Sequence, residues 1–339
     1  MDLVTLIAAI FVFLMVILFH EFGHFIIAKL VGIKVNEFSI GMGPKIFQTK
    51  KNETKYSLRL LPIGGYVSME GEDEKSNDPR SFNNVPAKYR IAVVAAGAIM
   101  NFVLAIVVFS VVSFNIGMQT TTVAETLPGS PAEIVGIETG DKIVRINNVE
   151  IKSWNSIINE ISNSNPAEDM TIEVVRNGEK KNFVLKPEVN EENRVIIGIM
   201  PTLKKGFIPA IKGGFQKTIS TLMLMFEFIK MVFKGQVTTK DLSGPVGVIY
   251  TIGEAAKYGF TDLLFLTGLI SVNLGFFNLL PIPALDGGRI VVLFLEIIRG
   301  KAIDPEKEGF IHFLGFIALI LLMLTITYSD IMRINMFRR

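Results

Sequence analysis

The sequence contains no cysteine and only three histidines among its 339 residues. The absence of cysteine excludes disulfide bonds and thiolate metal sites, so a bound metal ion would need histidine, aspartate or glutamate ligands. An excess of one charge is also missing, because 34 basic and 32 acidic residues leave a net charge of +2. No basic block with interleaved aromatic residues occurs, and we therefore expect no nucleic-acid partner.

Apolar residues make up half of the chain, and the mean hydropathy is +0.45. They gather in long blocks, and crossing about 30 Å of hydrocarbon takes roughly 20 helical residues. Four blocks reach this length: Leu3 to Leu30, Ile91 to Phe114, Leu263 to Ile282 and Gly309 to Tyr328. The predicted fold class is a polytopic α-helical membrane protein with about four transmembrane helices in a lipid bilayer.

The basic residues predict how the chain crosses the membrane. Residues 34–90 hold ten Lys or Arg, and cytoplasmic loops are enriched in these residues. We therefore expect this loop inside, residues 115–262 outside and the 283–308 loop inside. Three C-terminal arginines run against the rule, since they would lie outside: Arg333, Arg338 and Arg339.

Two segments between the blocks have other patterns. Residues 41–67 combine glycines with alternating apolar and polar residues, which predicts a membrane-associated β-hairpin. Residues 120–202 have a soluble composition and contain the only tryptophan, Trp154, which predicts a separate extracytoplasmic α+β domain. Residues 207–233 alternate apolar and charged residues at helical spacing and predict an amphipathic helix on the outer membrane surface.

The first apolar block contains the sequence His20-Glu21-Phe22-Gly23-His24. Helical residues four apart share a face, so both histidines can bind one ion while Glu21 reaches a water molecule beside it. Ionisable groups inside an apolar helix are costly and mark functional sites. The alternative is a pair of bundle-facing histidines with an interfacial glutamate. We predict a catalytic zinc site with Glu21 as general base, although two histidines and one carboxylate can also bind iron or cobalt.

A third ligand has two candidates. Asp286 follows two prolines and precedes two glycines, which break the third apolar block near its inner end. A broken helix frees backbone for a site and places this carboxylate at the depth of the first motif. His312 is the only other histidine, and it fits better as an interfacial residue of the fourth block. Asp286 is the preferred ligand.

Three motifs together resemble the site-2 protease family of intramembrane zinc metalloproteases, in its bacterial regulator-of-sigma-E-protease branch with a PDZ domain. They are His20-Glu21 with His24, Gly97 with Asn101, and the run from Asn278 through Pro281, Pro283 and Leu285 to Asp286-Gly287. Within residues 120–202, Gly129-Ser130-Pro131-Ala132 and Gly140-Asp141 resemble a PDZ domain. Such domains capture extended peptide tails by strand addition. A rigid size filter that binds no peptide is the alternative.

The resemblance implies a multi-pass protein of the inner (cytoplasmic) membrane with its active site near the cytoplasmic side. It implies one catalytic Zn²⁺ and cleavage of single-span membrane proteins, such as anti-sigma factors or signal-peptide remnants, after a first extracytoplasmic cut. We expect the substrate to contact Asn278, Asn101 and the glycine-rich edge Gly64, Gly65 and Tyr66.

The predicted parts are a protease core with the zinc motif at 1–115, the PDZ domain at 116–205, an amphipathic helix and connector at 206–262, and the core with the aspartate ligand at 263–339. Two other functional classes are alternatives. A catalytically silent membrane scaffold would not need Glu21. A metal-ion transporter would show internal repeats, and the sequence has none.

Overall fold

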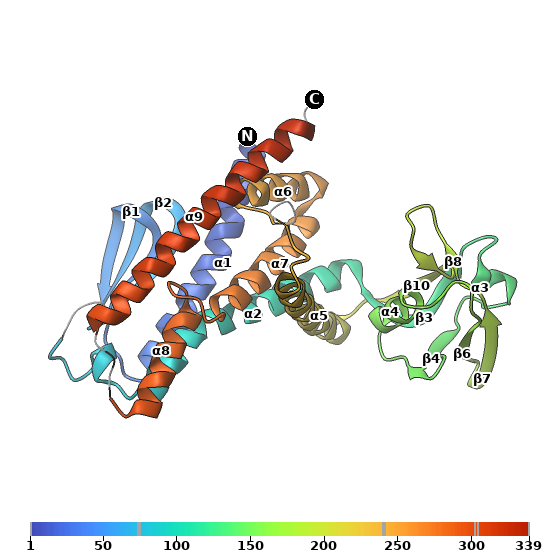
Figure 1. Cartoon of the computed structure of the whole chain (residues 1–339), viewed down its shortest axis with the longest axis horizontal. Coiled ribbons are helices and arrows are strands. Elements are labelled where there is room, and N and C mark those ends of the chain that lie inside the picture. Colours follow the sequence, from blue (N-terminus) through green and yellow to red (C-terminus); the bar gives the residue numbers. More distant parts are fainter. Residues whose placement is uncertain (1, 73–75, 239–241, 302, 304, 338–339) are drawn as a thin grey trace. The chain divides into compact units, whose positions relative to one another are not determined.

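The computed structural model describes residues 2–72, 76–238, 242–301, 303 and 305–337, so Arg338 and Arg339 lie outside the described residues. The chain forms two compact units (Figure 1). Unit 1 comprises Met1–Ser110 and Gly214–Arg339, and unit 2 comprises Val111–Gly213. Helices and one long hairpin build unit 1, whereas a β-sheet forms the centre of unit 2.

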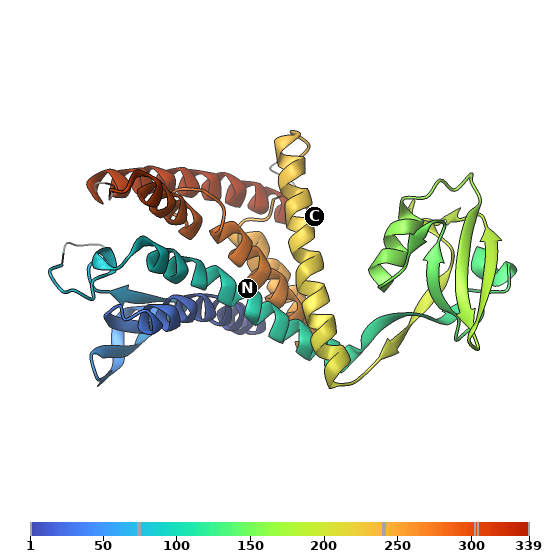
Figure 2. The ribbon, with the colours of Figure 1, turned by 90° about the horizontal axis from the view of Figure 1, so that it is seen from below.

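Four helices are long and apolar enough to cross a membrane by length and composition: α1 (Leu3–Leu30), α2 (Ala87–Ile116), α7 (Phe260–Asn278) and α9 (Pro305–Phe337). This confirms the four predicted blocks. The third ends earlier than predicted, because the prolines at 281 and 283 cannot continue a helix. The other long helices are α5 (Phe207–Phe233), α6 (Pro245–Tyr258) and α8 (Asp286–Arg299). Figure 2 shows α1, α2, α7 and α9 running through unit 1.

One stripe of α1 is buried. The helix begins after Asp2, whose carboxylate caps it by accepting a hydrogen bond from the Thr5 amide at 2.7 Å. The buried positions recur every three or four residues, as one helix face requires. They are Thr5, Ala8, Ala9, Val12, Val16, His20, Gly23, His24 and Ala28. Both histidines of the motif therefore lie on the face of α1 that packs against the rest of unit 1.

The predicted hairpin is formed by β1 (Val35–Lys51) and β2 (Thr54–Met69). The first half of β1 is flanked on both sides, since Phe38 lies opposite both Tyr56 and Val67. The last residues of β2 pair with β1 on one side only among the described strand pairs. The other edge of that segment is open to another group or chain.

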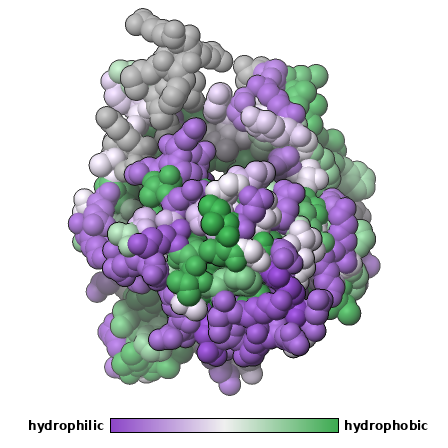
Figure 3. All heavy atoms as spheres, turned by 90° about the vertical axis from the view of Figure 1, so that its right-hand side faces the viewer, coloured by the Kyte–Doolittle hydropathy of each residue, from purple (hydrophilic) through white to green (hydrophobic). Residues whose placement is uncertain are grey.

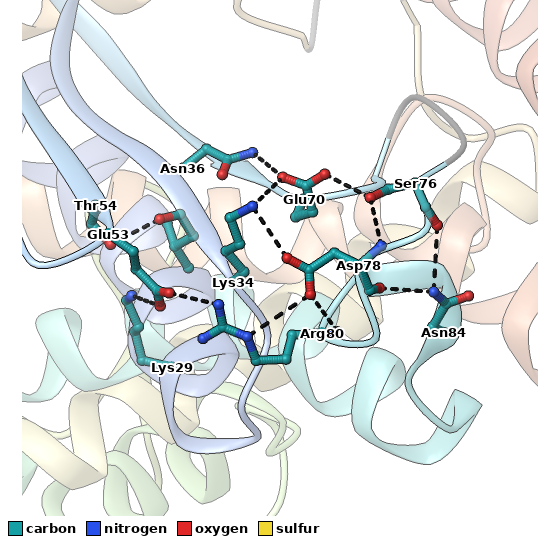
Figure 4. Close-up of polar contacts among 11 residues, drawn as sticks. Lys29, Lys34, Asn36, Glu53, Thr54, Glu70, Ser76, Asp78, Arg80 and Asn84 are labelled. Atoms are coloured by element: carbon teal, nitrogen blue, oxygen red, sulfur yellow. Dashed lines mark hydrogen bonds and ion pairs between the residues drawn. The ribbon is translucent and has the colours of Figure 1, made fainter.

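A polar network closes the base of the hairpin (Figure 4). Glu70 accepts hydrogen bonds from Ser76 at 2.6 Å and Asn36 at 3.1 Å, and it pairs with Lys34 at 3.1 Å. These partners lower the pKa of the Glu70 carboxyl to about 2. Lys34 also pairs with Asp78 at 3.2 Å. The residues that enter and leave the hairpin are thus held together by charge, next to η1 (Phe82–Asn84).

Unit 2 is a six-stranded sheet in the order β10-β3-β4-β6-β7, with β5 paired to β4, and a separate short pair β8-β9. Its elements are β3 (Met118–Thr126), α3 (Pro131–Ile134), β4 (Lys142–Ile146), β5 (Val149–Glu150), α4 (Trp154–Ser162), β6 (Met170–Arg176), β7 (Glu179–Leu185), β8 (Glu188–Val189), β9 (Val195–Ile196) and β10 (Ile199–Lys204). Isoleucine, valine and Trp154 side chains form its core. Hydrophilic residues cover most of the surface in the view of Figure 3, around a hydrophobic patch.

A buried ion pair supports unit 2. Asp141 is fully buried and receives hydrogen bonds from Arg176 at 2.7 Å to each of its oxygens, and from the Glu138 amide at 3.0 Å. Burial alone would raise the pKa of the Asp141 carboxyl, but these donors outweigh it, and the pKa lies below its usual value. The carboxylate therefore stays charged inside the unit.

Replacing Asp141 with Asn should destabilise unit 2 by about 3 kcal/mol, because Arg176 would lose its buried carboxylate partner and keep only the exposed carboxylate of Glu138 at 3.0 Å. The chain's single tryptophan, Trp154, lies in this core, so denaturation of the full chain followed by tryptophan fluorescence reports on this unit. In the wild type the pair's contribution should be complete above about pH 4 and be lost as pH falls through the lowered pKa. Glu150→Gln changes an exposed side chain and is the control. Equal stability of wild type, Asp141→Asn and Glu150→Gln would contradict the stabilising role of the buried Asp141–Arg176 pair.

Candidate metal centre and active site

His20 and His24 converge on one point from the buried stripe of α1. Their Nε2 atoms lie 3.2 Å apart, and both residues are 8% exposed. The rings stand nearly perpendicular, at 89°, with centroids 4.7 Å apart. The i,i+4 spacing in the sequence therefore produces the shared face that was predicted from it.

Asp286 reaches the same point from the first residue of α8. Its Oδ2 atom lies 3.3 Å from Nε2 of His20 and 3.6 Å from Nε2 of His24. The segment that brings it there folds back tightly on itself. A Cβ atom at Gly287 would lie 2.1 Å from the Leu280 carbonyl oxygen. Glycine after the aspartate is therefore required for the loop to place the carboxylate.

The three side chains fit a zinc ion. Among the described residues they form the one group whose histidine and carboxylate atoms converge, all within 4.8 Å of one another. In a tetrahedral zinc site with bonds of about 2.0–2.2 Å, ligand atoms lie about 3.3–3.6 Å apart, which matches the observed separations. Oδ2 of Asp286 is buried, with no hydrogen-bond partner among the described residues. A cation at this point would satisfy it.

The outer nitrogens of both rings have partners. Nδ1 of His24 lies 2.8 Å from the Val93 carbonyl oxygen of α2, so Nδ1 carries the hydrogen and Nε2 offers its lone pair. Asn101 is fully buried; its amide nitrogen Nδ2 lies 3.3 Å from Nδ1 of His20, and its Oδ1 lacks a donor among the described residues. With Oδ1 turned toward the ring, this amide accepts the Nδ1 hydrogen of His20. Asn101 then orients the ring.

The second helix leaves space for both rings at Gly97. A Cβ atom there would lie 2.4 Å from Nε2 of His24 and 2.7 Å from Cε1 of His20. A Cβ at Gly23 would lie 2.2 Å from the Ala96 carbonyl oxygen. The two glycines thus let α1 and α2 approach closely and leave the imidazoles room. Gly97 belongs to the sequence motif that contains Asn101, but only the fold reveals its contact with both rings.

Glu21 faces the hairpin. Its Oε2 atom accepts a hydrogen bond from the Val67 amide at 3.1 Å, which comes from the open edge of β2. A Cβ built at Gly65 would lie 3.8 Å from Cγ of Glu21. Tyr66 turns away, since its hydroxyl receives a hydrogen bond from Arg59 at 2.5 Å. The glycine-rich edge and the glutamate therefore lie side by side.

The remaining predicted residues surround this centre. The amide nitrogen of Asn278, at the end of α7, lies 3.4 Å from Nε2 of His20. Gly64 is buried with φ +82°, a conformation that side chains disfavour. His312 is not in the group that converges. Its Nδ1 accepts a hydrogen bond from the Ala284 amide at 3.1 Å, a contact that sequence analysis missed.

The sequence matches the peptidase family M50 over residues 8–322. The chain belongs to this family. A relative from Clostridium acetobutylicum whose name assigns it as a zinc metalloprotease is 41% identical over 98% of both chains. The regulator of sigma-W protease RasP of Bacillus subtilis is 33% identical and covers 97% of this chain and 99% of its own. The zinc metalloprotease RasP of Geobacillus kaustophilus is 31% identical, and the match covers 97% of this chain and 98% of that protein.

Among solved structures, the PDZ domain of an SdrC-like protein from Listeria monocytogenes covers 25% of this M50 peptidase and 87% of its own chain, with 21% identity and a TM-score of 0.21. The family and the names of the relatives make the chain a metallopeptidase. The resemblance stated from its motifs is thereby confirmed.

Replacing Gly97 with Ala should weaken zinc binding at least tenfold, because a methyl group cannot share the space of the two rings. Zinc affinity of the purified protein, measured by competition with a chelator, tests this. Ala92→Val, at an exposed position of α2, adds a larger group away from the site and should leave affinity unchanged. Equal affinity in all three proteins would show that Gly97 does not shape the centre.

Proposed function

We propose that this M50 peptidase is a zinc-dependent endopeptidase that cleaves within the membrane. The observation that carries the proposal is the convergence of His20, His24 and Asp286 at separations that suit zinc ligands. Both histidines and the adjacent Glu21 lie in α1, a helix apolar enough to cross a bilayer. His20, His24 and Asp286 hold the ion. When bound, zinc supplies Lewis-acid chemistry and lowers the pKa of a water molecule there to about 7.

The residues around the centre divide the work of hydrolysis. Glu21 takes a proton from the attacking water and delivers it to the amine nitrogen that leaves. Asn278 donates its amide to the carbonyl oxygen as charge develops, since that amide lies 3.4 Å from Nε2 of His20. Asn101 is fully buried and orients the His20 ring. It does not contact the peptide in this proposal, whereas the sequence had led us to expect it to bind substrate.

The hairpin edge holds the substrate as an extended strand. A transmembrane helix shields its carbonyls in hydrogen bonds and must unwind before hydrolysis. Alternate residues of a strand point their amides to the same side, and the Val67 amide points to Glu21, so Gly65 offers its backbone on that side too. A substrate paired with Gly64, Gly65 and Tyr66 would pass Glu21 and the metal ligands.

The remaining parts supply orientation and selection. The ten basic residues of 34–90 support a cytoplasmic position for the hairpin at the inner membrane. In the proposed arrangement the PDZ-like domain is then extracytoplasmic. By its motifs unit 2 is a PDZ domain, which excludes bulky outer domains or binds a peptide tail. The substrates are single-span membrane proteins, anti-sigma factors and signal-peptide remnants among them, already shortened by a first cut.

Glu21→Gln should slow cleavage of a model single-span substrate about a thousandfold, because the general base is lost. Zinc affinity should stay within a few-fold of wild type, because Glu21 is not a ligand. Asp286→Asn should lose both zinc and cleavage. Cleavage in detergent and chelator competition measure the two quantities. Glu254→Gln removes a carboxylate from a partly exposed pair with Lys257 and serves as control. Normal cleavage by Glu21→Gln would overturn the proposed mechanism.

Edge pairing can be tested by cross-linking, because the chain has no cysteine. Val67→Cys in the Glu21→Gln background introduces one thiol at a half-buried position of the strand whose edge is open. Substrates with single cysteines scanned along their span should form disulfides with it at every second position, as an extended strand requires. Cross-links that repeat every three to four positions would instead mean that the substrate lies there as a helix.

A further inference from the structure

The segment that presents Asp286 contains an unfavourable backbone conformation. Five non-glycine residues among the described ones have positive φ; four are asparagines, which tolerate it, and the fifth is Ala284 at φ +76°. An alanine in the left-handed region brings its Cβ too close to the following carbonyl oxygen. Such a conformation persists only where the surroundings hold it. Ala284 lies two residues before Asp286, so its conformation sets the direction from which the carboxylate arrives.

One face of α9 holds this segment. His312 Nδ1 accepts the hydrogen bond of the Ala284 amide at 3.1 Å. One turn later, a Cβ at Gly315 would lie 2.5 Å from the carbonyl oxygen of Pro283. One turn earlier, Glu308 lies 3.9 Å from Nε of Arg289 on α8. Positions 308, 312 and 315 share a helix face. This face of α9 therefore contacts the chain from Pro283 to Arg289 in α8.

These contacts stand out because the most apolar part of α9 is poorly covered within the described structure. None of the residues in the most apolar 18-residue window of α9 is buried within the described structure. Near the start of the helix its polar contacts are instead directed at the 283–289 segment. Unpaired backbone amides are costly away from water, and the Ala284 amide, which cannot join a helix at φ +76°, finds its acceptor in His312.

We propose that His312 is a positioning residue of the metal centre. By accepting the Ala284 amide it holds the strained turn that directs Oδ2 of Asp286 at Nε2 of His20 and His24. The inference rests on the metal site proposed above. It also argues against His312 as a metal ligand, the alternative to Asp286 in the sequence. Nδ1 of His312 accepts the Ala284 amide, and the ring is not in the group of converging ligand atoms.

The test compares variants at two positions by zinc affinity of the purified full chain, using chelator competition in detergent. His312→Leu removes the acceptor and should weaken zinc binding about tenfold or more, the effect usual for residues that orient a ligand. His312→Asn places its Oδ1 near the position of Nδ1 and should stay within about threefold of wild type. His312→Gln keeps a polar side chain but carries its acceptor one bond further out, and should resemble His312→Leu.

Ala284→Gly supplies the decisive comparison. Glycine adopts positive φ without strain, so this change in the His312→Leu background should recover part of the lost affinity and of the cleavage rate. Undiminished zinc affinity in His312→Leu, or no recovery with glycine, would overturn the proposal. Loss as complete as in Asp286→Asn, unrescued by His312→Asn, would make His312 a ligand instead.

The same assay separates this inference from the proposed function. If wild type binds zinc and Asp286→Asn does not, the metal centre stands whatever His312→Leu does. If Asp286→Asn binds zinc as tightly as wild type, the centre itself is wrong, and the role of His312 falls with it.

Discussion

Two imidazoles and one carboxylate brought together among apolar helices form the constraint on which unit 1 depends. Polar groups in such surroundings are unfavourable unless each finds a partner. Here the inner atoms of His20, His24 and Asp286 face one another, while the outer nitrogens of the rings meet Val93 and Asn101 of α2. The positions of α1, α2 and the α7–α8 junction are therefore coupled, because moving any one of them separates a polar atom from its partner.

Close packing makes this arrangement possible, and glycine makes the packing possible. At Gly23, Gly97 and Gly287 an added Cβ would come within 2.4 Å of a backbone oxygen or an imidazole nitrogen. Real Cβ atoms do not approach so closely, so each position excludes every larger residue unless a helix or loop shifts. The centre is consequently rigid, as preorganised catalysis requires.

Around this rigid centre lie elements that meet it through backbone groups. The open edge of β2 donates the Val67 amide to Glu21, and the segment before α8 donates the Ala284 amide to His312. Backbone donors hold side chains in place without depending on the identity of the residue that supplies them. Apart from the Val67 amide, this edge of β2 has no partner among the described strand pairs. An unwound peptide can find there the hydrogen bonds it has lost.

Much of this was accessible from the sequence. Long apolar blocks predicted the four helices, because crossing hydrocarbon demands length and apolarity; the i,i+4 spacing predicted that His20 and His24 share a face; and prolines before Asp286 predicted the helix break. All three depend on residues close together in the chain. The sequence alone did not reveal the contact of Gly97 with both rings, the amide of Val67 on Glu21, or the hold of His312 on Ala284. Those contacts join distant segments, two of them through backbone atoms that every residue type shares, so only the tertiary structure determines them.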